Sequence, residues 1–356
     1  MRTTQLLIQS APNQSAFHAT GFTPVVQRPV RDSQPQSQIQ NPQPSLHMHD
    51  IIGDIHGHAD ELTELLNKLG YAEHSGVFRH PSRQIIFCGD FIDRGPYIKD
   101  VLRICRAMCE DGAAQAVMGN HELNALAYHT PHPDRPEEFL RIQSDKNRKQ
   151  HRATLEQLDP AEIASALTWF RTLPVSIDTG HLRVVHACWD DHDLRILADA
   201  AARFGFMTDE YLQHAAISGN LICRSIERVM KGPEMHFPNG RFLTDKEGHV
   251  RSAGRIRWFE SSDGHNCATY SMPSRDDSEL AAFPVPRNAR PAPYHPSDPP
   301  LFIGHYWLSD LVPAPLAANV ACVDYSIAGN GMLAAYRHNR ERRLLAENFV
   351  TVSRMK

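Results

Sequence analysis

Residues 51–60 read IIGDIHGHAD, an apolar run that ends in an aspartate and a histidine two positions apart. Asp54 and His56 lie between two glycines, which let the backbone approach other groups without a Cβ in the way. In an extended segment, side chains two positions apart point to the same side. The stretch therefore predicts a buried strand that delivers a carboxylate and an imidazole to one point.

The same order of apolar strand, glycine, polar residue and helix occurs twice more, in RQIIFCGDFIDRGP (83–96) and AAQAVMGNHE (113–122). Helical spacing of apolar residues follows each strand. The positions concerned are Leu62, Leu65, Leu66 and Leu69, then Ile98, Val101, Leu102, Cys105 and Met108, and a third helix from about Leu123. Strands that alternate with helices predict a β-α-β-α-β unit with parallel strands and right-handed crossovers.

Composition divides the chain into a tail and one folded domain. Residues 1–47 are rich in Gln, Pro, Ser and Asn, a composition that buries too little apolar surface to offset the entropy of ordering, so we expect a disordered tail. We expect residues 48–356 to fold as one domain with two insertions. These are a charged, solvated helical insertion at about 131–158 and a proline-rich surface excursion, rather than core, at about 231–300.

Shorter signals mark the remaining elements. Asp159 directly before Pro160 predicts a capped helix start. Later strands are predicted in PVSID (174–178), HLRVVHA (181–187) and LFIGHYW (301–307), and a closing hairpin is predicted from MLAAYRH (332–338) and LLAENFVTV (344–352).

Charge and cysteine content exclude several classes of protein. Lys and Arg number 37 against 41 Asp and Glu, a net charge of −4, so neither nucleic acid nor a membrane surface is an expected partner. Seven scattered cysteines argue against a disulfide framework, and no apolar run is long enough to span a membrane. We therefore expect a cytoplasmic protein. Residues 1–31 contain Arg and Ser and no acid, so an organelle transit segment is the alternative, and no pattern predicts the oligomeric state.

Polar side chains follow the ends of five predicted strands. The ligand-type residues at these ends are Asp54, His56, Asp90, Asn120, His186 and His305. Because ligand sites of parallel sheets lie at the carboxyl ends of the strands, we expect these loops to converge on one crevice. His181 is the alternative candidate to His186, and His295 is the alternative candidate to His305.

The predicted ligands are oxygen and imidazole groups without thiolates. This set favours Mn²⁺, with Fe or Zn²⁺ as alternatives, over a structural zinc site. Asp54, Asp90 and Asp93 would repel one another in one crevice, and a carboxylate that bridges two ions removes most of that repulsion. The sequence therefore predicts two divalent metal ions.

The ordered motifs GDIHG (53–57), GDFIDRG (89–95) and GNHE (119–122), followed by His186 and by GH at His305, resemble those of the calcineurin-like metallophosphoesterases. They are most similar to the phosphoprotein phosphatase branch, and VDYSIAGNGMLAAYR (323–337) is similar to its bacterial members. The resemblance implies an α/β fold, namely a sandwich of mixed β-sheets flanked by helices around the β-α-β-α-β core. Residues 48–356 would be the catalytic domain.

The resemblance also implies two metal ligand sets. The first ion would be held by Asp54, His56 and Asp90. The second would be held by Asp90 as the bridge, with Asn120, His186 and His305. A hydroxide that bridges the two ions would attack phosphorus directly, without a phosphoenzyme.

Four further residues receive roles from the same resemblance. His121 would protonate the leaving oxygen, and Asp93 would keep that imidazole charged and oriented. Arg94 would bind the phosphate through its planar fork, together with Asn120, and stabilise charge in the transition state. Glu122 is expected to lie behind the ligands.

The substrate implied by the resemblance is a phosphate monoester, on a phosphoprotein, cleaved by a serine/threonine phosphatase-like enzyme. However, the sequence around the second phosphate-binding arginine of that branch is not found here, and Arg255 and Arg257 are candidates by chemistry alone. A dinucleoside polyphosphate hydrolase of the diadenosine tetraphosphate type, which shares the metal motifs, is the alternative. Its site would contain a stacking aromatic such as Tyr306 or Trp307. An inactive metal-binding scaffold is a further alternative.

Cys88 and Arg94 also match the C-x5-R spacing of thiolate phosphatases. A nucleophilic thiolate needs a positive field that lowers the cysteine pKa, whereas this loop contains Asp90 and Asp93. We therefore expect no cysteine nucleophile.

Overall fold

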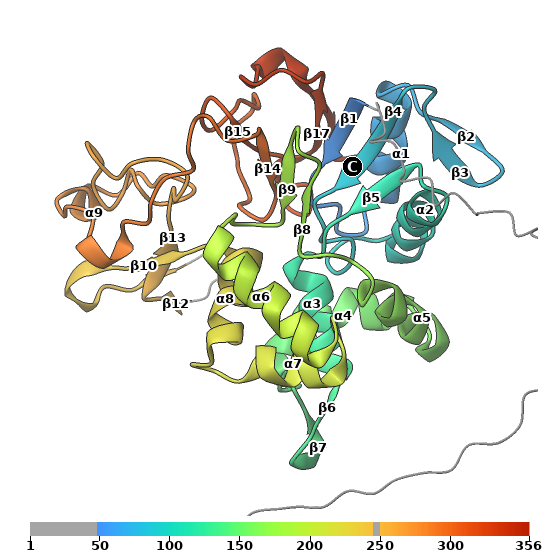
Figure 1. Cartoon of the computed structure of the whole chain (residues 1–356), viewed down its shortest axis with the longest axis horizontal. Helices are drawn as coiled ribbons and strands as arrows, with labels where there is room; N and C mark the ends of the chain where they lie inside the picture. The colour runs from blue at the N-terminus through green and yellow to red at the C-terminus, as the bar shows by residue number, and fades with distance from the viewer. Residues whose placement is uncertain (1–47, 245–249, 356) are drawn as a thin grey trace, which may run out of the picture. The chain divides into compact units, whose positions relative to one another are not determined.

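The computed structural model describes residues 48–244 and 250–355 (Figure 1). The tail predicted for residues 1–47 lies outside these ranges. The first sheet has the strand order β16-β17-β1-β4-β5, with β18 beside β17. Its strands are β1 (Met48–Ile52), β4 (Arg83–Phe87), β5 (Ala114–Ala116), β16 (Asp324–Tyr325), β17 (Met332–His338) and β18 (Phe349–Ser353).

The first sheet is mixed. Strands β1, β4 and β5 are parallel, with Ile52 opposite Phe87 and Ile85 opposite Ala114, which confirms the predicted parallel core. Strand β17 runs antiparallel to β1 and to β18, with a short helix η3 (Ala346–Asn348) before β18. The predicted closing hairpin is therefore confirmed.

The second sheet has four strands in the order β15-β14-β9-β8. They are β8 (Ser176–Asp178), β9 (Arg183–Val185), β14 (Leu301–Ile303) and β15 (Val320–Cys322). Strand β14 is parallel to both neighbours, and β8 pairs antiparallel with β9. All three later strands predicted from the sequence are present.

The two sheets pack face to face, and apolar side chains from both of them form a core between the sheets. Ile51 and Ile86 pack with Val184 and Phe302 in a cluster between the sheets. Their neighbours in the chain, such as Ile52, belong to the larger cluster that includes the helices. Side chains on a strand point alternately to its two faces, so one strand serves both cores. The sandwich of mixed sheets flanked by helices is confirmed.

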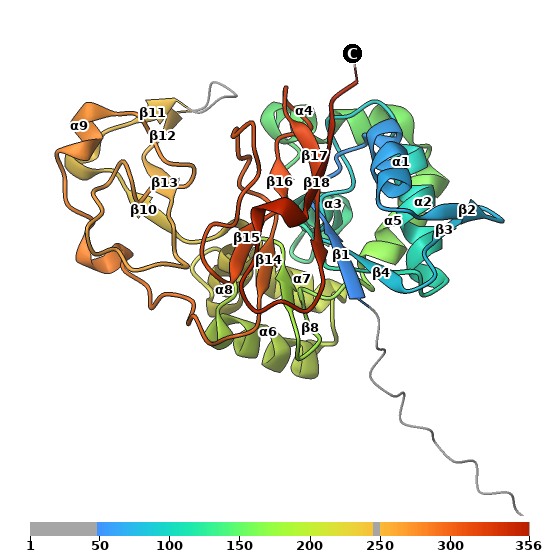
Figure 2. The same ribbon diagram turned by 90° about the horizontal axis from the view of Figure 1, so that it is seen from above.

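Helices α1 (Ala59–Lys68) and α2 (Ile98–Glu110) cover the outer face of the first sheet (Figure 2). Their predicted apolar positions are buried. A hairpin of β2 (Ala72–His74) and β3 (Val77–Arg79) follows α1. The carboxyl ends of β1 and β4 lie at one edge of the sheet because the two strands are parallel.

Helix α3 (Asn120–His129) begins three residues before the predicted start at Leu123. The Glu122 carboxylate accepts a hydrogen bond from the backbone N–H of Gly119 (3.0 Å), which caps the first turn. It also accepts from the backbone N–H of Asp90 (2.8 Å). The helix start is thereby fixed against the loop after β4, behind the ligand-type residues, as expected for Glu122.

A hairpin and two helices lie between α3 and β8, and three more helices follow β9. They are β6 (Pro131–His132), β7 (Arg135–Phe139), α4 (Asp145–Gln157), α5 (Pro160–Phe170), α6 (Asp191–Phe204), α7 (Asp209–Ala216) and α8 (Leu221–Lys231). Asp159 accepts from the backbone N–H groups of Ala161 and Glu162, so the predicted helix start is confirmed. None of the helices in the described ranges is long and apolar enough to cross a membrane.

The prediction of a solvated insertion at 131–158 is wrong for one face of α4. His151 and Thr154 on this face are buried, and so is Leu158 just after it. The buried face carries polar side chains, so no apolar periodicity marks it in the sequence.

The prediction that residues 231–300 lie outside any core is also wrong. Their regular structure is short, as expected: β10 (Glu234–His236), η1 (Pro238–Gly240), β11 (Leu243–Thr244), β12 (Val250–Arg251), β13 (Ala253–Arg255), α9 (Ser278–Ala281) and η2 (Arg287–Ala289). However, Trp258, Phe259 and Tyr270 are buried. Trp258 donates from its indole nitrogen to the Tyr306 hydroxyl (2.9 Å), which joins this segment to the loop after β14.

Candidate metal centre

All six predicted metal ligands are buried near the carboxyl ends of strands from both sheets. Asp54 and His56 follow β1, Asp90 follows β4, Asn120 begins α3, His186 follows β9 and His305 follows β14. The rival histidines at positions 181 and 295 are exposed. The structure therefore brings together the residues that the strand-end pattern selected.

The glycines at the strand ends permit this convergence. A Cβ on Gly53 would lie 2.0 Å from the carbonyl oxygen of Val323, and one on Gly89 would lie 2.4 Å from the backbone nitrogen of Gly119. Contacts this short exclude any side chain. The predicted role of these glycines in close backbone approach is confirmed.

Asp90 is the centre of the site. Its Oδ2 lies 3.6 Å from Nε2 of His56 and 3.5 Å from Nε2 of His186. Two groups of ligand-type atoms, each within 4.8 Å of one another, share it: Asp90 with His56 and His121, and Asp90 with His186 and His305. One carboxylate thus lies between two possible ion positions.

The other two predicted ligands adjoin the second group. The Oδ1 atom of Asn120 lies 3.2 Å from Nε2 of His186. Both carboxylate oxygens of Asp54 accept from the backbone N–H of His305 at 3.2 Å. Asp54 belongs to neither group of three, and His121 takes its place in the first.

The histidines are oriented as metal ligands usually are. Nδ1 of His56 donates to the carbonyl of Ile92 (2.8 Å), and Nδ1 of His186 donates to that of Cys88 (2.7 Å). Because a carbonyl only accepts, each Nδ1 carries a proton, and Nε2 of each ring is the atom that faces the centre. Nε2 of His56 and of His305 is buried without a hydrogen-bond partner among the described residues. These orphaned acceptors fit a bound metal ion.

Three buried carboxylates lie close enough to influence one another. Burial raises the pKa of Asp54 well above its usual value, and the charges of Asp324 and Asp90 add to this effect. Burial also opposes ionisation of Asp90, but the charges of His186, His121 and His56 and the hydrogen bond from His186 together outweigh it and hold the pKa of Asp90 well below its usual value. A cluster of this kind requires cations to keep its carboxylates ionised together.

The predicted general-acid pair is formed. Nδ1 of His121 donates to Oδ2 of Asp93 across 2.6 Å, and both side chains are buried. Burial lowers the pKa of His121, but the charges of Asp90 and Asp93 outweigh it and raise the pKa above its usual value. The imidazole therefore holds a proton that it can donate.

Arg94 lies beside an aromatic ring. Its guanidinium carbon is 4.2 Å from the ring centroid of Trp307, and both residues are half-buried. The backbone N–H of Trp307 donates to Oδ2 of Asp324 (2.7 Å), which fixes the loop after β14. The other aromatic considered from the sequence, Tyr306, is buried and donates its hydroxyl to the carbonyl of Ala187, so it is not available for stacking.

The loops of the site have an unusual backbone conformation. Six residues without the freedom of glycine adopt positive φ angles: His56 (46°), Asp90 (53°), Asp93 (68°), Arg94 (70°), His305 (69°) and Trp307 (52°). This region is unfavourable for such residues and is typical of functional sites that the surrounding fold holds in place.

The structure separates the two candidate arginines. Burial lowers the pKa of His305 well below its usual value, and the charge of Arg255 adds to this effect. Its Nε donates to the carbonyl of Lys231 (2.9 Å). Arg257 instead pairs with Glu260.

Three residues at the site were missed by sequence reasoning. Asp324 lies two residues after β15 and repeats the strand-end pattern, so it could have been found. His151 and Thr154 contact Asp93 from α4, and only their i, i+3 spacing could have indicated them.

Replacing Cys88 with serine is expected to leave turnover within about threefold of the wild type, because thiolate chemistry needs a lowered pKa. Cys88 is buried, and burial together with the charge of Asp54 raises the pKa of its thiol well above the usual value. Steady-state kinetics of the purified variant would test this. A loss of several orders of magnitude with normal folding would contradict it.

The chain is similar to several known proteins. A family model described as Calcineurin-like phosphoesterase matches residues 50–226. Bis(5'-nucleosyl)-tetraphosphatase PrpE [asymmetrical] of Bacillus subtilis is 31% identical over 178 residues, 48% of this chain and 67% of that protein. The protein of the same name from Halalkalibacterium halodurans is 48% identical over 73 residues, but the match spans only 20% of this chain and 30% of that protein. A solved serine/threonine phosphatase of Saccharomyces cerevisiae aligns over 89% of this chain and 82% of that chain, with 14% identity and a TM-score of 0.45.

Proposed function

The chain belongs to the calcineurin-like phosphoesterase family, and we propose that it is a hydrolase with two divalent metal ions that cleaves a phosphoanhydride bond of dinucleoside polyphosphates. The observation that carries the proposal is the position of Asp90 in both groups of ligand atoms. The names of the relatives favour a dinucleoside polyphosphate over a phosphoprotein as the substrate.

The ligand assignment is part of the proposal. Asp54, His56 and Asp90 would hold one ion. The second would be held by Asp90, Asn120, His186 and His305. Divalent ions such as Mn²⁺, Fe or Zn²⁺ would supply an activated water and neutralise phosphate charge. The orphaned Nε2 atoms of His56 and His305 support this assignment.

The remaining side chains would act on the leaving group and the phosphate. His121 would donate the proton from Nε2 to the leaving oxygen, while Asp93 orients the ring through Nδ1. Arg94 and Asn120 would bind phosphate oxygens. We assign the second phosphate-binding arginine to Arg255, because its charge acts on His305, whereas Arg257 is engaged by Glu260.

The aromatic ring beside Arg94 supports a nucleotide substrate. Trp307 is half-buried, and its ring lies against the guanidinium that would bind phosphate. A nucleobase linked to that phosphate could stack on such a ring, which a phosphoserine does not require.

The test compares two substrates with the purified full-length chain loaded with Mn²⁺. We expect hydrolysis of diadenosine tetraphosphate to exceed that of a phosphoserine peptide by at least about tenfold in kcat/KM, since a site that stacks and hydrogen-bonds its substrate discriminates by more than 1.4 kcal/mol. Strong chelators should abolish both activities. A faster reaction with the phosphopeptide would contradict the substrate assignment while leaving the hydrolase assignment intact.

A phosphoprotein is the second candidate substrate. The three ordered motifs favour it, because they are most similar to those of the phosphoprotein phosphatase branch. An inactive scaffold would release no phosphate from an aryl phosphate with Mn²⁺, so this simple assay separates it from both hydrolases.

A further inference from the structure

One face of α4 holds the loop that begins at Asp93. The polar side chains of this face, spaced three residues apart, are His151, Thr154 and Gln157. Gln157 donates from Nε2 to the carbonyl of Gly95 (2.8 Å) and accepts at Oε1 from the backbone N–H of Ile98 (2.8 Å). Gln157 thus fixes the far end of the loop, whereas His151 and Thr154 contact Asp93.

Both oxygens of the Asp93 carboxylate are occupied. Oδ2 accepts from His121, whereas Oδ1 accepts from Nδ1 of His151 (2.8 Å) and from Oγ1 of Thr154 (2.6 Å). All four side chains are buried. Rotation of an aspartate about χ2 is intrinsically soft, so the donors to Oδ1 determine where Oδ2 points.

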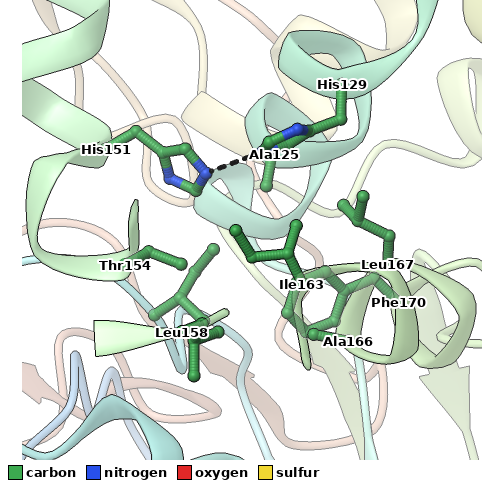
Figure 3. Close-up of a pocket in the computed structure, with 10 residues that line it drawn as sticks. Ala125, His129, His151, Thr154, Leu158, Ile163, Ala166, Leu167 and Phe170 are labelled. Atoms are coloured by element: carbon green, nitrogen blue, oxygen red, sulfur yellow. Dashed lines mark hydrogen bonds between the residues drawn. The ribbon is translucent and has the colours of Figure 1, made fainter. Parts of the chain in front are cut away.

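A second histidine holds His151 in turn. Its Nε2 lies 3.3 Å from Nε2 of His129, and apolar side chains such as Leu158 and Ile163 line the small cavity beside the pair (Figure 3). Burial and the charge of His151 lower the pKa of His129 to about 4, so that ring is neutral near pH 7. Two nitrogens at this distance cannot both accept, so one ring donates to the other and the orientation of His151 is set.

We propose that His151, aligned by His129, is a positioning residue of the general-acid pair His121 and Asp93. His151 belongs to neither group of possible metal ligands, and it acts by holding Oδ1 of Asp93 so that Oδ2 stays on His121. The proposal rests on the proposed phosphoesterase function. Its consequence is selective: only a reaction that needs proton donation to the leaving group depends on this alignment.

The test uses two aryl phosphates with the Mn²⁺-loaded protein. Phenyl phosphate has a poor leaving group that needs protonation, whereas 4-nitrophenyl phosphate has a good one. In His151→Leu we expect kcat for phenyl phosphate to fall at least about tenfold and kcat for 4-nitrophenyl phosphate to stay within about threefold, with KM unchanged for both. In His151→Asn, the amide nitrogen can replace Nδ1 as the donor, so kcat should return to within about threefold of the wild type.

Matched variants exclude a general structural effect. Arg152→Leu changes a residue on the exposed face of the same helix. This variant should leave kcat unchanged for both aryl phosphates. Thr154→Val removes the other donor to Oδ1 with little change of shape and should reproduce the selective loss if His151→Leu does not fold. Equal losses for both substrates, loss of bound metal, or no loss at all would overturn the proposal.

A measurement without turnover separates this proposal from the proposed function. The short bond from Nδ1 of His121 to Asp93 should give a far-downfield proton resonance in the metal-free protein. We expect the resonance to be lost in His151→Leu and retained in His151→Asn. Its retention in His151→Leu would overturn the positioning role. Absence of any wild-type phosphate release would instead overturn the phosphoesterase function.

Discussion

Replacement of His121 by asparagine is expected to lower kcat for phenyl phosphate at least about a hundredfold while two metal ions stay bound, since this is the usual size of a general-acid contribution. The side chain holds a proton under the influence of Asp90 and is oriented by Asp93. Asparagine cannot donate a proton to the leaving oxygen at comparable strength. Steady-state kinetics and elemental analysis of the same preparation would measure both quantities.

The metal content of the variant distinguishes a general acid from a metal ligand at position 121. Nε2 of His121 lies 3.9 Å from Oδ2 of Asp90 and belongs to the first group of ligand-type atoms. If His121 were a ligand rather than an acid, the variant would lose one equivalent of metal. His181→Asn, at an exposed position, is the matched control and should behave as the wild type. Unchanged turnover in His121→Asn would end the general-acid assignment.

Replacement of Asp90 by asparagine is expected to have the largest effect of any single substitution. The amide removes the one negative charge shared by both groups of ligand atoms, so metal affinity should fall by about a hundredfold or more. Turnover should fall about a thousandfold or more, which corresponds to several kcal/mol of lost transition-state stabilisation. Isothermal titration with Mn²⁺ and kinetics at saturating metal would separate the two losses.

The same substitution also tests how the charge of Asp90 stabilises the protonated His186 in the metal-free protein. Against burial, which lowers it, the charge of Asp90 raises the pKa of His186 to about 10. Without that carboxylate, the buried imidazole would lose the charge and the hydrogen bond that most favour its protonated form, and we expect the thermal midpoint of the metal-free protein to fall. Asp60→Asn, on the exposed side of α1, is the control and should change neither metal binding nor midpoint. Normal metal binding by Asp90→Asn would contradict the shared-ligand assignment.

Sequence reasoning found the parts of the site that local chemistry specifies. Asp54, Asp90 and Asn120 each follow an apolar strand and a glycine, and parallel strands bring such ends to one edge. His186 and His305 follow the same rule on the second sheet, so their convergence needed no knowledge of side-chain packing.

The residues that sequence reasoning missed depend on pairing between distant segments. His151 lies on a helix whose composition is strongly polar, and its burial follows only from the packing of α4 against the loop at Asp93. Likewise, Trp258 and Tyr270 belong to the main buried cluster, although no regular period marks buried positions in this proline-rich segment. Arg255 could be separated from Arg257 only in the fold, where Arg257 pairs with Glu260 and Arg255 donates to the carbonyl of Lys231.

The predicted ligands come from both halves of the sandwich. Asp54 and Asp90 follow strands of the first sheet, whereas His186 and His305 follow strands of the second. Ions held between them would fasten the two sheets together and would be released on unfolding. At a free concentration about a hundred times its Kd, each ion would add about 2.7 kcal/mol to the free energy of unfolding. Scarcity of transition metal in the surroundings would then shorten the lifetime of the protein itself, because proteases degrade the opened chain.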